Sequence, residues 1–183
     1  KRTILVGHWG SEEQGLNGSR AFVEDHPEIV TKLQALFNQD NGTGRIANIS
    51  GQGFNHAGEF ISHWLAAVPS ILKDSIKTNF PGTPGGGGSD FASFVAAGAP
   101  GFSLSSLSWS YYNYTWHTNR DTYDKIIFDD LRGNAIITAI MVYMACEDPK
   151  TLPRDKANLS SGQPIPWPIQ VKSLRKGPVV PKK

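Results

Sequence analysis

The sequence predicts an α/β fold. Short apolar, β-branched runs alternate along the chain with stretches whose apolar residues recur at helical spacing. Carboxylates and a histidine fall in the segments that follow the expected strands, where α/β proteins gather their ligands. The 183 residues are 39% hydrophobic and 19% charged, which is enough apolar material for one core and typical of a single globular domain.

The beginning of the chain is expected to hold three strands and two helices. Residues 3–9 (TILVGHW) form an apolar run bounded by glycine, which indicates a buried strand. Helices are expected over about residues 15–24 and from about Asp25, the second with an apolar stripe that runs to Leu36. The next strands are expected in ALFNQD and RIANIS, so that Asp40 lies in the loop between them.

The rest of the chain continues the alternation. Residues 55–77 have a helical pattern with Phe60, Trp64 and Leu65 as expected core, and a loop rich in glycine and proline follows. The last expected elements are a short helix stopped by glycine, a strand, an aromatic loop and an apolar helix: FASFVAAG, PGFSLSSL, SWSYYNYTWHTNRDT and FDDLRGNAIITAIMVYMACED.

Composition and charge exclude two classes of partner. The net charge is +2, and the one cluster of Lys and Arg is the proline-punctuated stretch Lys172 to Lys183, so nucleic-acid binding is not expected. No run of 18 or more apolar residues occurs, so no membrane span is expected. Residues 1–148 are expected to form the domain, and residues 149–183 a solvated extension rich in Pro and Lys.

The expected loops offer ligands for a cation. Two carboxylates and one histidine from separate loops suit a cation such as Zn²⁺, and a further carboxylate beside them suits a general base: the residues are Glu12, Glu13, Asp40 and His117. Each also has a plain structural interpretation, because the Glu pair can complement a helix dipole, Asp40 can stabilise a turn and His117 can pack on tyrosines. Asp90 is expected either at a pocket wall or as a helix N-cap.

Four motifs in a fixed order point to a family. EEQGLNGS follows the first expected strand and NQD the next, and GGGGSDFASFVAAGAPGFSL and HTNRDTYDKI come after them. In this order they closely resemble the co-catalytic zinc exopeptidases of metallopeptidase family 28, over about Thr3 to Asp148. Within that family, the chain looks most like the branch of plasma glutamate carboxypeptidases. Two features carry this resemblance: GAPGFSL precedes an aromatic loop, and LPR follows the last expected helix. The resemblance implies a three-layer α/β/α fold with a mixed, largely parallel central sheet, incomplete in this chain.

The resemblance also implies roles for the loop residues. Glu12 would be the general base that takes a proton from water. Glu13 and His117 would ligate one zinc and Asp40 the other, in a site with two Zn²⁺. Adjacent carboxylates at a tight turn can then divide the work, one reaching the metal and the other the water, because a nearby dication offsets their mutual repulsion.

Further residues near this site have expected roles on the substrate side. Trp116 stands where several relatives have a tyrosine that stabilises the oxyanion, and its indole N–H can donate one hydrogen bond. Asp90 is a candidate for the pocket wall. Asp121 and Asp124 are expected to cap a helix or to support His117.

The family pattern also needs an upstream His-x-Asp, which the residues before Glu12 do not supply, because His8 is the one histidine there and lies in the expected strand. We therefore expect an upstream segment of the same catalytic domain to provide that histidine and a bridging aspartate. The implied protein is a zinc-dependent exopeptidase, an aminopeptidase or dipeptidase, that acts on short peptides in a secreted or periplasmic location. A homodimer is left open. The alternative is a catalytically inactive peptidase-like binding module.

Overall fold

The computed structural model describes residues 1–40, 42–157 and 166–175. Within them, one mixed sheet has the strand order β1-β4-β2-β3. Its strands are β1 (Leu36–Asn38), β2 (Ile46–Ser50), β3 (Lys77–Asn79) and β4 (Gly101–Ser106). β1 runs parallel to β4, and β2 runs parallel to β3, while β4 and β2 are antiparallel. The predicted sheet, mixed and largely parallel, is confirmed.

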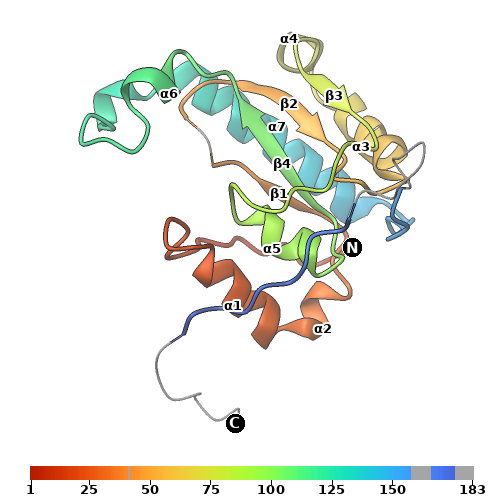
Figure 1. Cartoon of the computed structure of the whole chain (residues 1–183). Helices are drawn as coiled ribbons and strands as arrows, with labels where there is room; N and C mark the ends of the chain where they lie inside the picture. The colour runs from red at the N-terminus through yellow and green to blue at the C-terminus, as the bar shows by residue number, and fades with distance from the viewer. Residues whose placement is uncertain (41, 158–165, 176–183) are drawn as a thin grey trace.

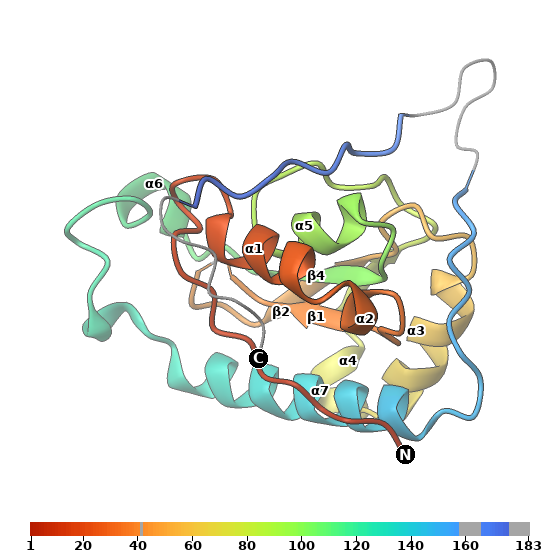
Figure 2. The same cartoon turned by 90° about the horizontal axis from the view of Figure 1, so that it is seen from below.

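Helices cover both sides of this sheet (Figures 1 and 2). One layer holds α1 (Asn17–Asp25), α2 (Pro27–Val30) and α5 (Phe91–Ala96). The other holds α3 (Ala57–Ala66), α4 (Ser70–Lys73) and α7 (Phe128–Glu147). The loop between β4 and α7 contains the short helix α6 (Tyr111–Tyr114) and the 3₁₀ turn η1 (Tyr123–Lys125). None of the helices in the described part of the chain combines the length and apolar character that a membrane span requires.

The main apolar core lies between the sheet and the layer of α3 and α7. Phe37 of β1 pairs in register with Phe102 of β4, and Phe37 meets Trp64 of α3 edge to face, with ring centroids 6.0 Å apart. Trp64 is fully buried, and its indole N–H donates to Asp148 Oδ2 over 2.8 Å. Residues four apart along a helix lie on the same side, and one such row of α7 faces this core, whereas Leu131, Ile136 and Tyr143 of the same helix are exposed. α7 contributes Ile137, Met141 and Ala145.

The register of the strands also produces a polar face on the sheet. Residues that pair across neighbouring strands point their side chains to the same side, and side chains along one strand alternate. The polar face consists of Asn38 on β1, Ser103 and Ser105 on β4, Asn48 and Ser50 on β2, and Lys77 and Asn79 on β3. It is continuous because Asn48 pairs with Ser105 on one side and with Lys77 on the other.

Residues 3–9 do not form the predicted strand. They have no regular secondary structure, and none of the backbone hydrogen bonds described joins them to the sheet. Ile4, Leu5 and Val6 are 54%, 59% and 79% exposed. The prediction was wrong because an apolar run becomes a buried strand only where another strand pairs with it and another layer covers it, and the described residues supply neither.

Two predicted helices are shorter than expected. α2 ends at Val30, and Leu36 belongs to β1 instead. The segment 55–77 divides into α3, α4 and the first residue of β3, because Pro69 lacks the N–H that a continuous helix needs. The strand β3 was missed because all three of its side chains are polar and exposed, so it has no apolar alternation. The other predicted helices and strands are confirmed to within a few residues.

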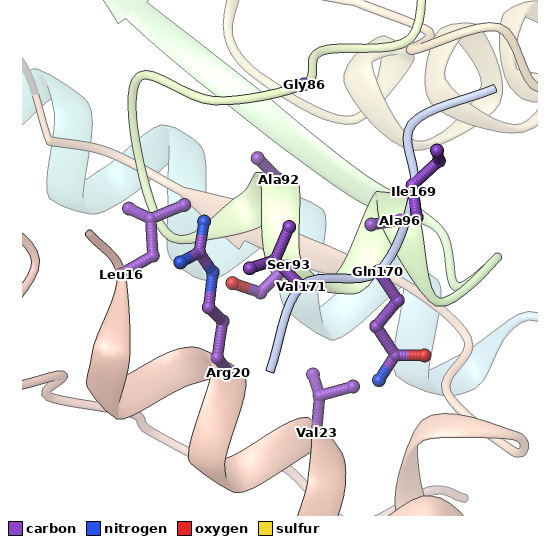
Figure 3. Close-up of a pocket in the computed structure, with 10 residues that line it drawn as sticks. All are labelled: Leu16, Arg20, Val23, Gly86, Ala92, Ser93, Ala96, Ile169, Gln170 and Val171. Carbon is purple, nitrogen blue, oxygen red and sulfur yellow. The ribbon is translucent and has the colours of Figure 1, made fainter. Parts of the chain in front are cut away.

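Residues 166–175 lie across α1 and α5, as the blue segment in Figure 2 shows. The indole N–H of Trp167 donates to the carbonyl of Val95 over 2.7 Å, and Ser173 and Arg175 bind Glu24. Figure 3 shows residues 169–171 of this segment beside residues of α1 and α5, around a hollow of about 20 Å³. That volume holds about one water molecule. The expected extension over residues 149–183 stays a prediction, and residues 158–165 and 176–183 lie outside the described part.

Arg154, which follows the last helix, ties two helix ends together. Its guanidinium donates to the carbonyls of Val30, Leu33 and Gly98, over 2.9 to 3.1 Å. Val30 is the last residue of α2, and Leu33 and Gly98 lie shortly after α2 and α5, where backbone acceptors lack partners within the helix. Burial lowers the pKa of Arg154, but a guanidinium remains charged at any pH at which the protein folds.

We expect Arg154→Ala to lower the free energy of unfolding by about 2 kcal/mol, because it leaves three part-buried acceptors without their charged donor. Arg154→Lys should recover only part of the loss, since an ammonium cannot reproduce the planar fork. Urea unfolding measures both. The control is Arg132→Ala, which removes an exposed ion pair with Asp129 and should cost about 0.5 kcal/mol or less. Equal unfolding midpoints for the Arg154→Ala and Arg132→Ala variants would contradict this role.

Candidate active site

Glu12 and Glu13 lie in a tight turn that leads into α1. The carbonyl of Glu12 accepts hydrogen bonds from the N–H groups of Gly15 and Leu16, each over 2.8 Å. Ser11, Gly15 and Leu16 all have positive φ, a backbone conformation that residues other than glycine rarely adopt. The turn therefore holds the backbone of the two glutamates in one constrained conformation.

The structure brings Glu13 and His117 together, although they are 104 positions apart in the sequence. His117 Nε2 lies 3.0 Å from Glu13 Oε1. The imidazole of His117 stacks on the indole of Trp116, with ring centroids 3.9 Å apart and an interplanar angle of 24°. Tyr112 supports Trp116 from the side, edge to face at 5.4 Å. His117 also has a positive φ, so the loop and the stacked ring together fix the direction of its imidazole.

Glu12 is surrounded by charged side chains. Burial raises the pKa of the Glu12 carboxyl. The negative charges of Asp40, Glu13 and Asp90 raise this pKa further, and His117 lowers it. The charges of Asp40, in the loop after β1, and of Asp90, directly before α5, therefore act on the Glu12 carboxyl. A raised pKa makes a carboxylate a better proton acceptor near neutral pH.

Asp90 occupies the N-cap position of α5, but its side chain makes no capping hydrogen bond. It is 6% exposed, and its Oδ1 is buried without a hydrogen-bond partner among the described residues. Burial raises the pKa of Asp90, a hydrogen bond from Ser19 lowers it, and the charge of Asp40 raises it. The N-cap interpretation is therefore not supported. A buried carboxylate oxygen without a partner is costly, and it is the kind of atom that a cation or a ligand donor would satisfy.

One pair in the aromatic loop could not be predicted from the sequence. The Tyr111 hydroxyl donates to Asp121 Oδ2 over 2.6 Å. Burial and this bond raise the pKa of Tyr111 to about 12, so the phenol stays protonated at neutral pH. Asp121 thus holds a tyrosine and does not cap a helix. Asp124, the other expected cap, accepts from the hydroxyl of Thr122 over 2.5 Å.

The donors fit part of a zinc site. Histidine nitrogen and carboxylate oxygen are ligands that Zn²⁺ takes in proteins, and Glu13 and His117 present one of each at a single point. The charges of Asp40 and Asp90 act on Glu12, and Asp90 Oδ1 is buried without a hydrogen-bond partner among the described residues. Across residues 1–40, 42–157 and 166–175, however, no three side chains of His, Cys, Asp or Glu form a cluster suited to a metal ion. Catalytic zinc has three protein ligands, so further donors are required.

A mixed sheet between two helix layers defines an α/β protein, and its loops carry carboxylates and a histidine. The sequence profile described as Peptidase family M28 matches residues 1–142. The chain belongs to peptidase family M28, and the resemblance seen in its four motifs is confirmed.

Known proteins similar to the chain agree with this assignment. Carboxypeptidase Q from Mus musculus is 24% identical over 154 residues, which are 84% of this chain and 31% of that protein. A probable glutamate carboxypeptidase from Arabidopsis thaliana is 33% identical over 122 residues, 57% of this chain and 17% of that protein. The crystal structure of a peptidase M28 precursor from Shewanella amazonensis SB2B superposes with a TM-score of 0.66 at 25% identity, covering 79% of this chain and 31% of that one. The chain thus spans less than a third of these relatives.

Proposed function

We propose that the chain is part of a zinc-dependent exopeptidase that hydrolyses short peptides, as an aminopeptidase or dipeptidase. The observation that carries the proposal is the 3.0 Å contact between Glu13 and His117, with Glu12 next in the chain. Membership of family M28 supports peptide hydrolysis in general. The similar proteins carry carboxypeptidase names, so action at the carboxyl end of a peptide is the second form of this proposal.

In this proposal the acidic residues divide the work. Glu13 and His117 would hold one Zn²⁺ and Asp40 the second. Bound zinc supplies Lewis-acid polarisation of the scissile carbonyl and makes water acidic enough to react near neutral pH. Glu12 accepts the proton of the attacking water and passes it to the leaving amine.

Two further residues are proposed on the substrate side. Trp116 stacks on His117 and is 46% exposed, so its indole N–H is available to donate to the carbonyl oxygen of the substrate. Asp90 is proposed at the pocket wall, where its unpaired Oδ1 would accept a donor from the ligand.

We propose that a further segment of the same catalytic domain supplies the missing histidine and the bridging aspartate. The part that matches this chain is 31% of two of these relatives, so about two thirds of each of them lies outside it. That remainder leaves room for such a segment. The exposed side chains of Ile4, Leu5 and Val6 offer it an apolar surface to pack against. A homodimer and a secreted or periplasmic location stay predictions.

Zinc analysis of the full-length gene product tests the proposed function. We expect two Zn²⁺ per protein, together with hydrolysis of short peptides that a chelator abolishes and added zinc restores. The chain of 183 residues alone should bind zinc weakly, because it offers only part of the donor set. If the full-length product binds no zinc and cleaves no peptide, the alternative of a catalytically inactive binding module is correct.

A further inference from the structure

The turn that carries the two glutamates is joined to the start of α1 by close backbone contacts. The N–H of Asn17 donates to the carbonyl of Ser11 over 3.1 Å, and the N–H of Gly18 donates to the carbonyl of Gly10 over 2.9 Å. A Cβ at residue 18 would lie 2.5 Å from that carbonyl oxygen, so only glycine allows this approach. The turn and the first residues of α1 are therefore one unit, and a shift of this helix end would shift the turn.

The side chain of Asn17 links this turn to residues 166–175. Its Nδ2 donates to the carbonyl of Gln14, the residue after Glu13, over 2.9 Å. Its Oδ1 accepts a hydrogen bond from the N–H of Leu174, also over 2.9 Å. A primary amide can donate and accept at once, so each of the two bonds fixes the orientation of the amide for the other. Together they form a bridge, the Asn17 bridge, between the backbone of the turn and the backbone of residues 166–175.

Residues 166–175 are anchored at both ends where they lie across α1 and α5 (Figure 2). At one end, the indole of Trp167 packs edge to face on Phe54, with ring centroids 5.1 Å apart. At the other end, the hydroxyl of Ser173 donates to the Glu24 carboxylate of α1 over 2.8 Å, and its backbone N–H donates to the same carboxylate. The residue after Ser173 supplies the N–H of the Asn17 bridge, so this donor is held in a defined position relative to α1.

We propose that Asn17 is a positioning residue for the candidate active site and that residues 166–175 act through it. The segment holds the amide of Asn17, this amide holds the carbonyl of Gln14, and the turn holds the two glutamate carboxylates where the proposed reaction needs them. The proposal rests on the proposed exopeptidase function and adds a positioning element to it. Residues 166–175 lie outside residues 1–142, which the family profile matches, so membership of the family does not imply this role.

Leu174→Pro tests the Asn17 bridge, because proline has no N–H to donate. Leu174→Ala is the matched control, since it keeps the N–H and removes a side chain that is 72% exposed. In the full-length product with saturating zinc, we expect Leu174→Pro to lower kcat of dipeptide hydrolysis by about 10- to 100-fold, because misplacing a catalytic group by about 1 Å can cost about 100-fold. KM should stay within about twofold of the wild type, since substrate binding is not the step that loses its group. Leu174→Ala should keep the wild-type kcat.

Variants of Asn17 test the bridge from its other side. Asn17→Asp keeps the acceptor for the N–H of Leu174 but loses the donor to the carbonyl of Gln14, and its kcat should fall as in Leu174→Pro. Asn17→Ala removes both bonds. The double variant Asn17→Ala/Leu174→Pro should be no slower than Asn17→Ala alone, because one bridge carries both effects. Losses that add in the double variant would overturn the bridge.

Hydrogen exchange separates this inference from the proposed function, because it does not depend on turnover. Mass spectrometry of a fragment that covers residues 10–18 reports the amides of the turn, and a fragment that covers β4 is the reference. In the full-length product, Leu174→Pro should make exchange in residues 10–18 about tenfold faster, whereas Leu174→Ala should not, and β4 should stay unchanged in both.

The outcomes of the two measurements are distinct. Faster exchange in Leu174→Pro, in a product whose wild type hydrolyses no peptide, would support the Asn17 bridge and overturn the exopeptidase. Peptide hydrolysis by Leu174→Pro at the wild-type kcat would overturn the positioning role alone. Unchanged exchange in residues 10–18 of Leu174→Pro would overturn the bridge, whatever the wild type hydrolyses.

Discussion

Glu12→Gln is expected to lower kcat of the full-length product by about 100- to 10,000-fold, the usual contribution of a positioned general base. Glutamine has nearly the same shape and keeps one acceptor oxygen, but it cannot take up a proton. Folding and zinc binding should stay as in the wild type, because Glu12 makes no side-chain hydrogen bond among the described residues that the substitution would break. Removing one of several clustered negative charges should relieve repulsion with Asp40, Glu13 and Asp90.

The measurement is steady-state hydrolysis of a dipeptide, with zinc content and thermal unfolding recorded on the same sample. Glu59→Gln is the matched control, since Glu59 lies on α3 in an exposed ion pair with Lys150. Its kcat should match the wild type. If Glu12→Gln turned over substrate at the wild-type rate with its zinc intact, another group would have to be the base.

His117→Ala is expected to weaken zinc binding by more than about 100-fold, because loss of a direct ligand exceeds the 10- to 100-fold cost of losing a supporting residue. Glu13→Gln should weaken binding as well, through loss of the negative charge that the metal prefers. The 3.0 Å contact between the two side chains predicts that their effects are not additive, because both act on one ion.

Competition with a zinc-sensitive dye measures these affinities directly and does not depend on turnover. His63→Ala serves as the control, since His63 lies exposed on α3, in the opposite helix layer from α1 and α5. Wild-type zinc affinity in the His117→Ala variant would remove His117 from the metal site. In that case its contact with Glu13 would be an ordinary hydrogen bond between two loops.

Local sequence patterns were sufficient for most of the secondary structure. The helices α1, α5 and α7 and the strands β1, β2 and β4 lie where apolar residues and flanking turn residues predicted them, so each was predictable from its own segment. β3 was not, because three exposed polar residues form a strand only where β2 offers a neighbouring edge. Residues 3–9 were predicted to form a strand and do not, since an apolar run without a pairing strand stays outside the sheet.

In the candidate site, too, the residue types were predictable from the sequence, whereas the contacts between distant segments were not. The motifs around Glu12, Asp40 and His117 indicated zinc peptidase chemistry in family M28 from residue types and order alone, and the family is confirmed. Their geometry could not be predicted: Glu13 and His117 are 104 positions apart, and neither the stacking of Trp116 nor the bond between Tyr111 and Asp121 has a periodic signal. Contacts of this kind depend on where loops from different elements meet.

The sequence by itself determined the family, the class of fold and the residues that carry the proposed chemistry. Each of these depends on the local spacing of apolar residues or on the order of the motifs. Only the tertiary structure decided that Asn48 lies between Ser105 and Lys77 and that Asp90 keeps a buried oxygen without a partner. The physical reason is that side chains from distant segments become neighbours through strand order and register. Long-range packing sets these, and no short stretch of sequence encodes them.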